Sequence, residues 1–178
     1  MNVSIEPMKF SHVPSVVAIE KQVYSSPWSE HAFINEILDN GFASYYVLLI
    51  DGEVAGYTGI WVILDEAHIT TLAISPPWQG KGFGRSLLEH VIAEAAKKGA
   101  TRITLEVRIS NLKAQSLYKK LGFAACGVRP NYYTDEDALV MWLDKLPSFC
   151  DKYSVSAANK KIVPAAEQGW ERKLWKKN

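Results

Sequence analysis

The chain has 178 residues, of which 48% are hydrophobic and 22% charged, with a formal net charge of +1 at pH 7. This composition is typical of a globular protein, and the length fits one domain with a sizeable core. No apolar run approaches the length that spans a bilayer, and so small a net charge gives no indication of nucleic-acid binding.

The two ends of the chain differ in character. Residues 1–7 lack a basic segment followed by an apolar stretch, which predicts no secretory signal and a cytoplasmic location. The cysteines and histidines show no metal-ligand spacing, so no metal is expected. From Ser148 onward, seven basic residues stand against three acidic ones. We expect a domain over 1–146 and a basic extension over 147–178, whose role is either a packed or solvated tail or, over 152–177, a weak RNA contact.

Hydrophobic periodicity and turn residues divide the first 146 residues into strands and helices. Strands are expected at 3–5, 44–50, 54–64, 67–74, 102–107, 123–128 and 138–143, and helices at 11–24, 29–40, from the glycine-rich turn to 98, and at 112–121. Ser11 and Ser29 are the expected N-caps of the first two helices, and Asp51-Gly52 is a strong hairpin signal. This order predicts a single-domain α/β (α+β) fold: a mixed, mostly antiparallel sheet with helices on both faces.

The most informative motif is the stretch Gln79-Gly-Lys-Gly-Phe-Gly-Arg85, which joins the strand ending at Ile74 to the next helix. Glycines at the start of a helix leave backbone N–H groups open to a ligand, and the helix dipole adds a positive field. Lys81 and Arg85 add two charged donors. The turn is therefore predicted to bind a phosphate or pyrophosphate.

Two common nucleotide-binding motifs do not fit this turn. A Walker loop ends in Gly-Lys-Ser/Thr, whereas Gly84 is followed by Arg85-Ser86. A dinucleotide-binding loop requires Gly-x-Gly-x-x-Gly, whereas these glycines are evenly spaced at 80, 82 and 84. The spelling Gln-x-x-Gly-x-Gly instead resembles the acetyl-CoA pyrophosphate loop of the GNAT superfamily of N-acetyltransferases.

Further motifs follow in the order typical of that superfamily. They are Asp65-Glu-Ala67, Thr71-Leu-Ala-Ile74, Leu105-Glu-Val-Arg108, Ser110-Asn111, Leu117-Tyr118 and Leu121-Gly-Phe123. Pro27-Trp-Ser-Glu30 and Asn131-Tyr-Tyr133 are similar to the RimI branch, the ribosomal-protein alanine N-acetyltransferases. The resemblance covers about residues 1–146. It implies acetyl-CoA as co-substrate and, as acceptor, the N-terminal alanine of the eighteenth small-subunit ribosomal protein.

The resemblance also implies two catalytic residues. Glu106, in Leu-Glu-Val-Arg, matches the glutamate assigned as proton acceptor, and Tyr118 matches the tyrosine that protonates the leaving sulfur. Strand alternation puts Glu106 on the face opposite Leu105 and Val107. From the residues alone, an exposed strand carboxylate and a core tyrosine would be the more ordinary interpretations.

Other site residues are implied in the same way. The acetyl-CoA site would comprise the main chain of Leu72, Ala73 and Ile74, the turn residues Gln79, Gly80, Lys81, Gly82, Phe83, Gly84 and Arg85, and Asn111. The Ile74 N–H is the expected oxyanion donor, and Asn111 equally suits a helix N-cap. The expected substrate-binding residues are Trp28, Glu66, Tyr132 and Tyr133, with Glu66 orienting the amine.

Two other functions stay open. A free α-amine has a pKa near 8 and a lysine amine near 10.4, so a modest base suits an N-terminal acceptor better. Without a visible nucleophile, transfer is expected to be direct. The first alternative is a GNAT enzyme for lysine side chains or a small amine, such as a polyamine or an antibiotic. The second is a non-catalytic, ribosome-associated module that binds acetyl-CoA.

Overall fold

The computed structural model describes residues 1–146; the basic extension, with its expected RNA contact, lies outside the described residues. The strands are β1 (Val3–Pro7), β2 (Ala43–Ile50), β3 (Glu53–Ile63), β4 (Glu66–Ile74), β5 (Arg102–Arg108), β6 (Ala124–Tyr133) and β7 (Glu136–Leu143). The helices are α1 (Val13–Val23), α2 (Glu30–Leu38), α3 (Phe83–Lys97) and α4 (Leu112–Lys120). Among these described helices, none has the length and apolarity needed to cross a membrane.

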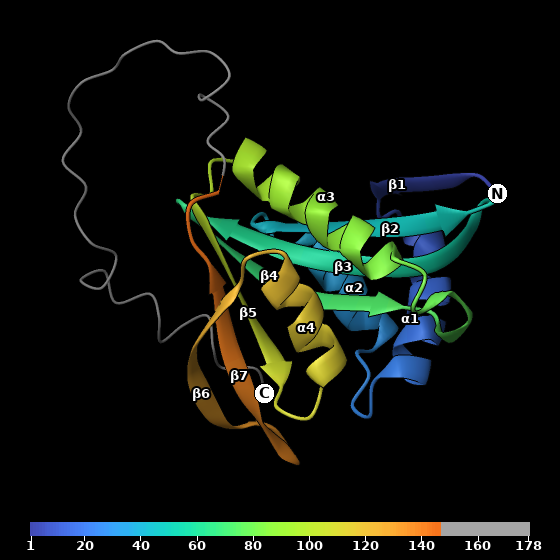
Figure 1. The fold of residues 1–178 in the computed structure, drawn as a ribbon. Coiled ribbons are helices and arrows are strands. Elements are labelled where there is room, and N and C mark those ends of the chain that lie inside the picture. The colour runs from blue at the N-terminus through green and yellow to red at the C-terminus, as the bar shows by residue number, and fades with distance from the viewer. Residues whose placement is uncertain (147–178) are drawn as a thin grey trace, which may run out of the picture.

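The strands form one sheet in the order β1-β2-β3-β4-β5-β7-β6 (Figure 1). Only the β4–β5 pair is parallel among the neighbouring strands described, and the others are antiparallel. The parallel pair arises because α3 connects β4 to β5 across one face of the sheet. The mixed, mostly antiparallel sheet predicted from the element order is confirmed.

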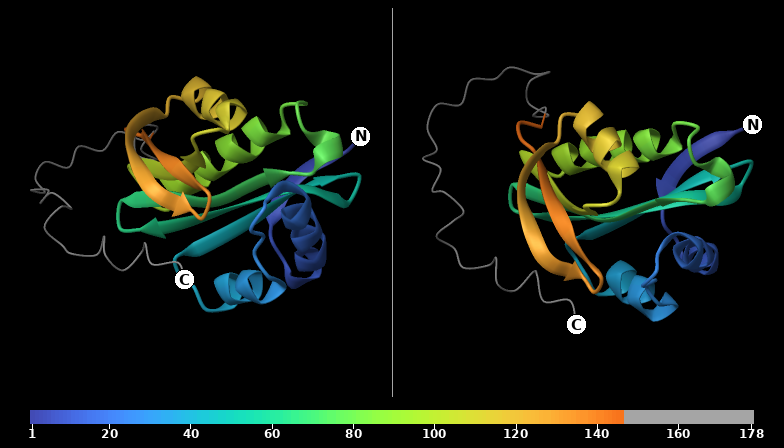
Figure 2. Two further views of the ribbon diagram at one scale, coloured as in Figure 1. Left: turned by 90° about the horizontal axis from the view of Figure 1, so that it is seen from below. Right: turned by 60° about the horizontal axis from the view of Figure 1, so that its bottom comes forward.

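Helices cover both faces of the sheet, as predicted: α1 and α2 lie on one side and α3 and α4 on the other (Figure 2). Each side has an apolar core: Phe33 of α2 packs with Tyr57 of β3 in one, and Leu88 of α3 packs with Ile103 of β5 in the other. Apolar residues on both faces of β2 make this a doubly covered strand.

Of the two N-cap residues predicted from the sequence, one is confirmed and the other is not. The Ser29 side chain accepts a hydrogen bond from the Ala32 N–H (3.2 Å) and caps α2 as predicted. Ser11 does not cap α1; it lies in a short 3₁₀ helix, and α1 begins at Val13. Pro14 explains the difference, because proline suits the first turn of a helix, where its missing N–H is not needed.

The feature that creates the site is a gap between β4 and β5. Their pairing runs from Glu66 opposite Arg102 to Ile69 opposite Leu105 and stops there, although both strands continue. At the same point β4 has a bulge, since Thr70 has no partner in the register with β3. A bulge bends and twists a strand, which carries the end of β4 away from β5. We call the opening between residues 70–74 and 106–108 the gap.

Candidate active site

A cavity of about 690 Å³ lies at the gap. Its walls come from Glu20, Tyr24, Ser26 and Trp28 at one end, from 69–72 and 105–108 on the two strands, from Asn111, Ala114, Leu117 and Tyr118, and from 129–133 on β6. Because the strands part here, the cavity includes residues from both faces of the sheet. Glu106 and Tyr118, predicted from separate motifs, line the same cavity.

Glu106 is held by side chains from β4, which pairs with β5, and from β6, which lies beyond β7 in the sheet. Its side chain is only 3% exposed, and one carboxylate oxygen lies 2.7 Å from Nε2 of His68 on β4. The other carboxylate oxygen lies 3.3 Å from a guanidinium nitrogen of Arg129 on β6. Both partners were missed by sequence reasoning, because neither belongs to a local motif and both reach Glu106 only through strand pairing. The carboxylate is therefore fixed in position inside the cavity.

Tyr118 is a buried phenol on α4. Burial, together with the neighbouring Tyr24 and Tyr133, raises its pKa above the ordinary tyrosine value. The hydroxyl therefore keeps its proton at neutral pH and can act as a donor. Tyr24, also missed from the sequence, donates a hydrogen bond to the Leu72 carbonyl (2.7 Å), and burial raises the pKa of Tyr24 to about 12.

The strand edges at the gap are capped by side chains. Hydrogen bonds run from Tyr24 to the carbonyl of Leu72 (2.7 Å), from Gln79 to that of Ile74 (2.9 Å), from Tyr133 to that of Glu106 (3.4 Å) and from Gln115 to that of Arg108 (3.1 Å). A buried carbonyl requires a donor, and no neighbouring strand supplies one here. Gln79, the first residue of the glycine motif, therefore also closes the end of β4.

The glycine-rich turn has the backbone form that an anion site requires. Gly80 (φ 76°) and Gly82 (φ 90°) adopt left-handed conformations, and Gly82 is the N-cap of α3. A Cβ on either residue would have no atom within 4 Å, so the space over the turn is open. A Cβ on Gly84 would lie 3.6 Å from Leu117, which lines the cavity. The start of α3 therefore packs against the cavity wall, and the turn before it is open.

Comparison with known proteins identifies the family. The family described as "Acetyltransferase (GNAT) family" matches residues 13–123. The chain belongs to this family. It is therefore an acetyl-CoA-dependent N-acetyltransferase, as the glycine motif predicted.

Two relatives and one crystal structure show which members of the family this chain is similar to. The chain is 43% identical over 142 residues to a Bacillus subtilis (strain 168) protein provisionally named [ribosomal protein bS18]-alanine N-acetyltransferase, covering 79% of this chain and 94% of that protein. It is 38% identical over 146 residues to the Escherichia coli (strain K12) [ribosomal protein bS18]-alanine N-acetyltransferase, covering 79% and 96%. The crystal structure of the Escherichia coli ribosomal-protein-S18-alanine N-acetyltransferase aligns with a TM-score of 0.76 at 34% identity, covering 90% of this chain and all of that one.

The charged and aromatic residues of the glycine-rich turn have partners in the segments on either side of it. Lys81 Nζ lies 4.6 Å from the centre of the Trp78 ring, and the Phe83 ring packs against the same indole at 5.9 Å. Arg85 Nε donates to Glu89 one helical turn later (2.8 Å). Both pairs are near the surface, where a phosphate could compete with them.

Of the remaining predicted residues, Leu72 lines the cavity, whereas Ala73 and Ile74 follow it on β4 and are not among the lining residues. Asn111 lines the cavity and also caps α4, accepting from the Ala114 N–H at 3.0 Å. Trp28, Tyr132 and Tyr133 line it as well. Glu66 does not: it begins β4, far along the strand from the gap, and its carboxylate pairs with Arg102. The predicted role of Glu66 in orienting the amine does not fit this position.

Residues 1–146 contain no group of three or more His, Cys, Asp or Glu side chains that could hold a metal ion.

Proposed function

We propose that this GNAT enzyme transfers the acetyl group of acetyl-CoA to the N-terminal α-amine of ribosomal protein bS18, an alanine. The names and similarity of the relatives support this substrate, as do the Pro27-Trp-Ser-Glu30 and Asn131-Tyr-Tyr133 segments, of which Trp28 and 131–133 contribute to the cavity. Such a substrate would put the enzyme in the cytoplasm. We propose 1–146 as the catalytic domain, because the sheet, both cores and the cavity lie within it.

The single observation on which the mechanism rests is that Glu106 and Tyr118 line one cavity at the gap. Glu106 would accept a proton from the incoming ammonium group, and the free amine would then attack the thioester carbonyl carbon. A C–N bond forms and the C–S bond breaks. Tyr118 would give its proton to the leaving thiolate and would regain one as the acylated nitrogen loses its second proton, while the proton on Glu106 would return to solvent. No acyl-enzyme is needed.

The two groups suit these tasks for different reasons. An α-amine has a pKa near 8, so it needs only a modest base close to neutral pH. Glu106 is fixed by His68 and Arg129, which reduces the cost of orienting it. Tyr118 remains a neutral phenol because burial raises its pKa, so a proton is available for the departing sulfur.

For acetyl-CoA, we propose that the first-turn amides of α3 and the glycines at 80 and 82 receive the pyrophosphate. The pantetheine arm would follow 72–74 along the open edge of β4, as an added strand does. The Ile74 N–H is our candidate oxyanion donor, and Asn111 would contact the arm from the start of α4.

Peptide profiling tests the substrate. The purified enzyme would be given acetyl-CoA and either the N-terminal peptide of bS18, the same peptide with a blocked α-amine and an internal lysine, or a polyamine. We expect acetylation at the alanyl α-amine, located by mass spectrometry. Turnover confined to the lysine peptide or the polyamine would refute the proposed acceptor. Binding of acetyl-CoA without turnover of any amine would favour the non-catalytic alternative.

A further inference from the structure

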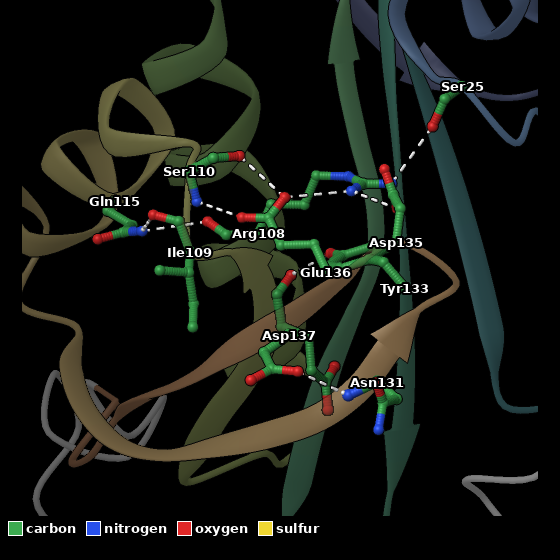
Figure 3. A network of polar contacts seen from close by, with 11 residues as sticks. Ser25, Arg108, Ile109, Ser110, Gln115, Asn131, Tyr133, Asp135, Glu136 and Asp137 are labelled. Atoms are coloured by element: carbon green, nitrogen blue, oxygen red, sulfur yellow. Dashed lines mark hydrogen bonds and ion pairs between the residues drawn. The ribbon is translucent and has the colours of Figure 1, made fainter.

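Arg108 occupies a position that the proposed reaction does not use. It is the last residue of β5 and lines the cavity two residues after Glu106. Its guanidinium donates from Nη1 to Asp135 (2.8 Å) and Glu136 (3.2 Å), and from Nη2 to Ser25 (3.3 Å) (Figure 3). These partners come from two separate parts of the chain, because Ser25 follows α1 whereas the two carboxylates stand at the turn between β6 and β7.

The same side chain also stacks on an aromatic ring. The guanidinium carbon of Arg108 lies 4.2 Å from the centre of the Tyr133 ring, and the Tyr133 hydroxyl reaches the Glu106 carbonyl (3.4 Å). A planar guanidinium can stack and donate in its own plane at the same time, which an ammonium group cannot do. The position therefore calls for arginine specifically.

Glu136 extends the connection to α4. Its carboxylate accepts from the Ser110 N–H (2.5 Å) and the Ser110 hydroxyl (2.9 Å), next to the N-cap residue Asn111. From within α4, Gln115 donates to the carbonyls of Arg108 (3.1 Å) and Ile109 (2.8 Å). Figure 3 shows these contacts as one continuous network.

The two segments that Arg108 joins stand on either side of the cavity. Ser26 and Trp28 line it from the α1–α2 loop, and Asn131 and Tyr132 line it from β6. Without the hydrogen bonds of Arg108, the distance between these two walls would depend on other contacts of the α1–α2 loop and β6. Both walls line the same cavity as Glu106, so their separation bears on access to that carboxylate.

We infer that Arg108 is a positioning residue that ties the α1–α2 loop to the β6–β7 turn and thereby sets the opening through which the acceptor amine reaches Glu106. The inference rests on the proposed function for the identity of the acceptor. Its consequence is specific to one substrate, since the glycine-rich turn that would hold acetyl-CoA makes none of these contacts. Loss of the tie should affect acceptor binding more than acetyl-CoA binding or turnover at saturation.

The test compares Arg108→Gln with Arg102→Gln. Arg102 is a matched control because it begins the same strand, pairs with a carboxylate, Glu66, and lies over an aromatic ring, Trp142 (4.6 Å), yet does not line the cavity. We expect Arg108→Gln to raise the KM for the acceptor peptide about tenfold, with kcat and the KM for acetyl-CoA within about twofold of wild type. Arg108→Lys should restore little of the wild-type KM for the acceptor peptide. Arg102→Gln should leave kcat and both KM values unchanged.

Hydrogen exchange supplies a readout that needs no substrate. In Arg108→Gln, amides in 24–28 and 131–136 should exchange faster than in wild type, and in Arg102→Gln they should not. Ser25→Ala, which removes one surface contact, should speed exchange in 24–28 alone and covers the case in which Arg108→Gln fails to fold. An unchanged acceptor KM, or unchanged exchange in either segment, would overturn the inference. A wild-type enzyme that ignores alanyl peptides would refute the proposed acceptor instead; KM would then be measured with the amine it does use.

Discussion

At the scale of single residues, Glu106 is defined by its surroundings. A carboxylate on a strand is ordinary, but this one is almost fully buried and touches His68 from β4 and Arg129 from β6. A buried charge is tolerated only with such partners. Their presence explains how a carboxylate can stay fixed inside the cavity, beside the gap where we propose that the acceptor amine arrives.

Replacing Glu106 by glutamine should lower kcat by about 10²–10⁴-fold, because the amide has a similar shape but cannot accept the proton. The dissociation constant for acetyl-CoA, measured by calorimetry, should stay within a few-fold of wild type. Glu66→Gln is the control, since Glu66 is also a buried glutamate paired with an arginine but lies outside the cavity. Equal losses in the two variants would contradict the role of Glu106.

The state of Tyr118 predicts a pH dependence. Its pKa is raised by burial, so the protonated acid persists to a higher pH than an ordinary tyrosine, whose pKa is near 10. The ratio of wild-type kcat to that of Tyr118→Phe should therefore stay constant from about pH 7 to about pH 9.5. A ratio that declines toward 1 above pH 8, in initial-rate measurements, would show that the phenol ionises too early to be the donor.

At the scale of elements, the turn before α3 combines strained backbone with open space. Gly82→Ala should raise the dissociation constant for acetyl-CoA at least tenfold, because a Cβ at φ 90° is strained and projects into the space over the turn. Gly52→Ala is matched in strain, with φ 89° and an equally open surround, but lies in the β2–β3 hairpin.

Both glycine variants should lose stability by about 1 kcal/mol in denaturant titrations, which reflects the shared backbone cost. Only Gly82→Ala should also lose affinity in calorimetry. Weakened binding in both would indicate a general loss of structure rather than a defect in the anion site.

Local patterns predicted the elements and much of the site, because periodicity, capping and turn chemistry act over a few residues. The type and order of the helices and strands follow in this way, and so does Ser29 as a cap. The cavity places Glu106, Tyr118 and Asn111 together, but their catalytic and binding roles remain predictions.

What the sequence did not reveal depends on contacts between distant segments. His68 and Arg129 reach Glu106, and Tyr24 lines the cavity, through strand register and helix packing, and nothing local distinguishes them. Glu66, a predicted substrate-binding residue, lies outside the cavity, because a motif position does not show which end of a strand faces the gap. The bulge at Thr70 likewise has no local sequence pattern that would predict it.

At the scale of the whole molecule, β4 and β5 join a four-stranded part of the sheet to a three-stranded part. The junction is short, with pairing only from Glu66–Arg102 to Ile69–Leu105. A ligand in the gap contacts both parts and should therefore stabilise the molecule as a unit. At 100 times its dissociation constant, acetyl-CoA should add about 2.7 kcal/mol to the free energy of unfolding.

That stabilisation can be measured as a rise in melting temperature with acetyl-CoA concentration. Hydrogen exchange should slow on both β4 and β5 when the ligand is present. Protection limited to α3 and its preceding turn would mean that the ligand does not enter the gap.

The parting of β4 and β5 also means that elements from both sides of the sheet line one cavity. The glycine-rich turn and α4 stand on one side, while Glu106 and the walls joined by Arg108 stand on the other. If each reactant binds from its own side, as we propose, acetyl-CoA and the acceptor can occupy the cavity together, and neither has to leave before the other enters. For an enzyme without a covalent intermediate, that arrangement is what simultaneous occupancy requires.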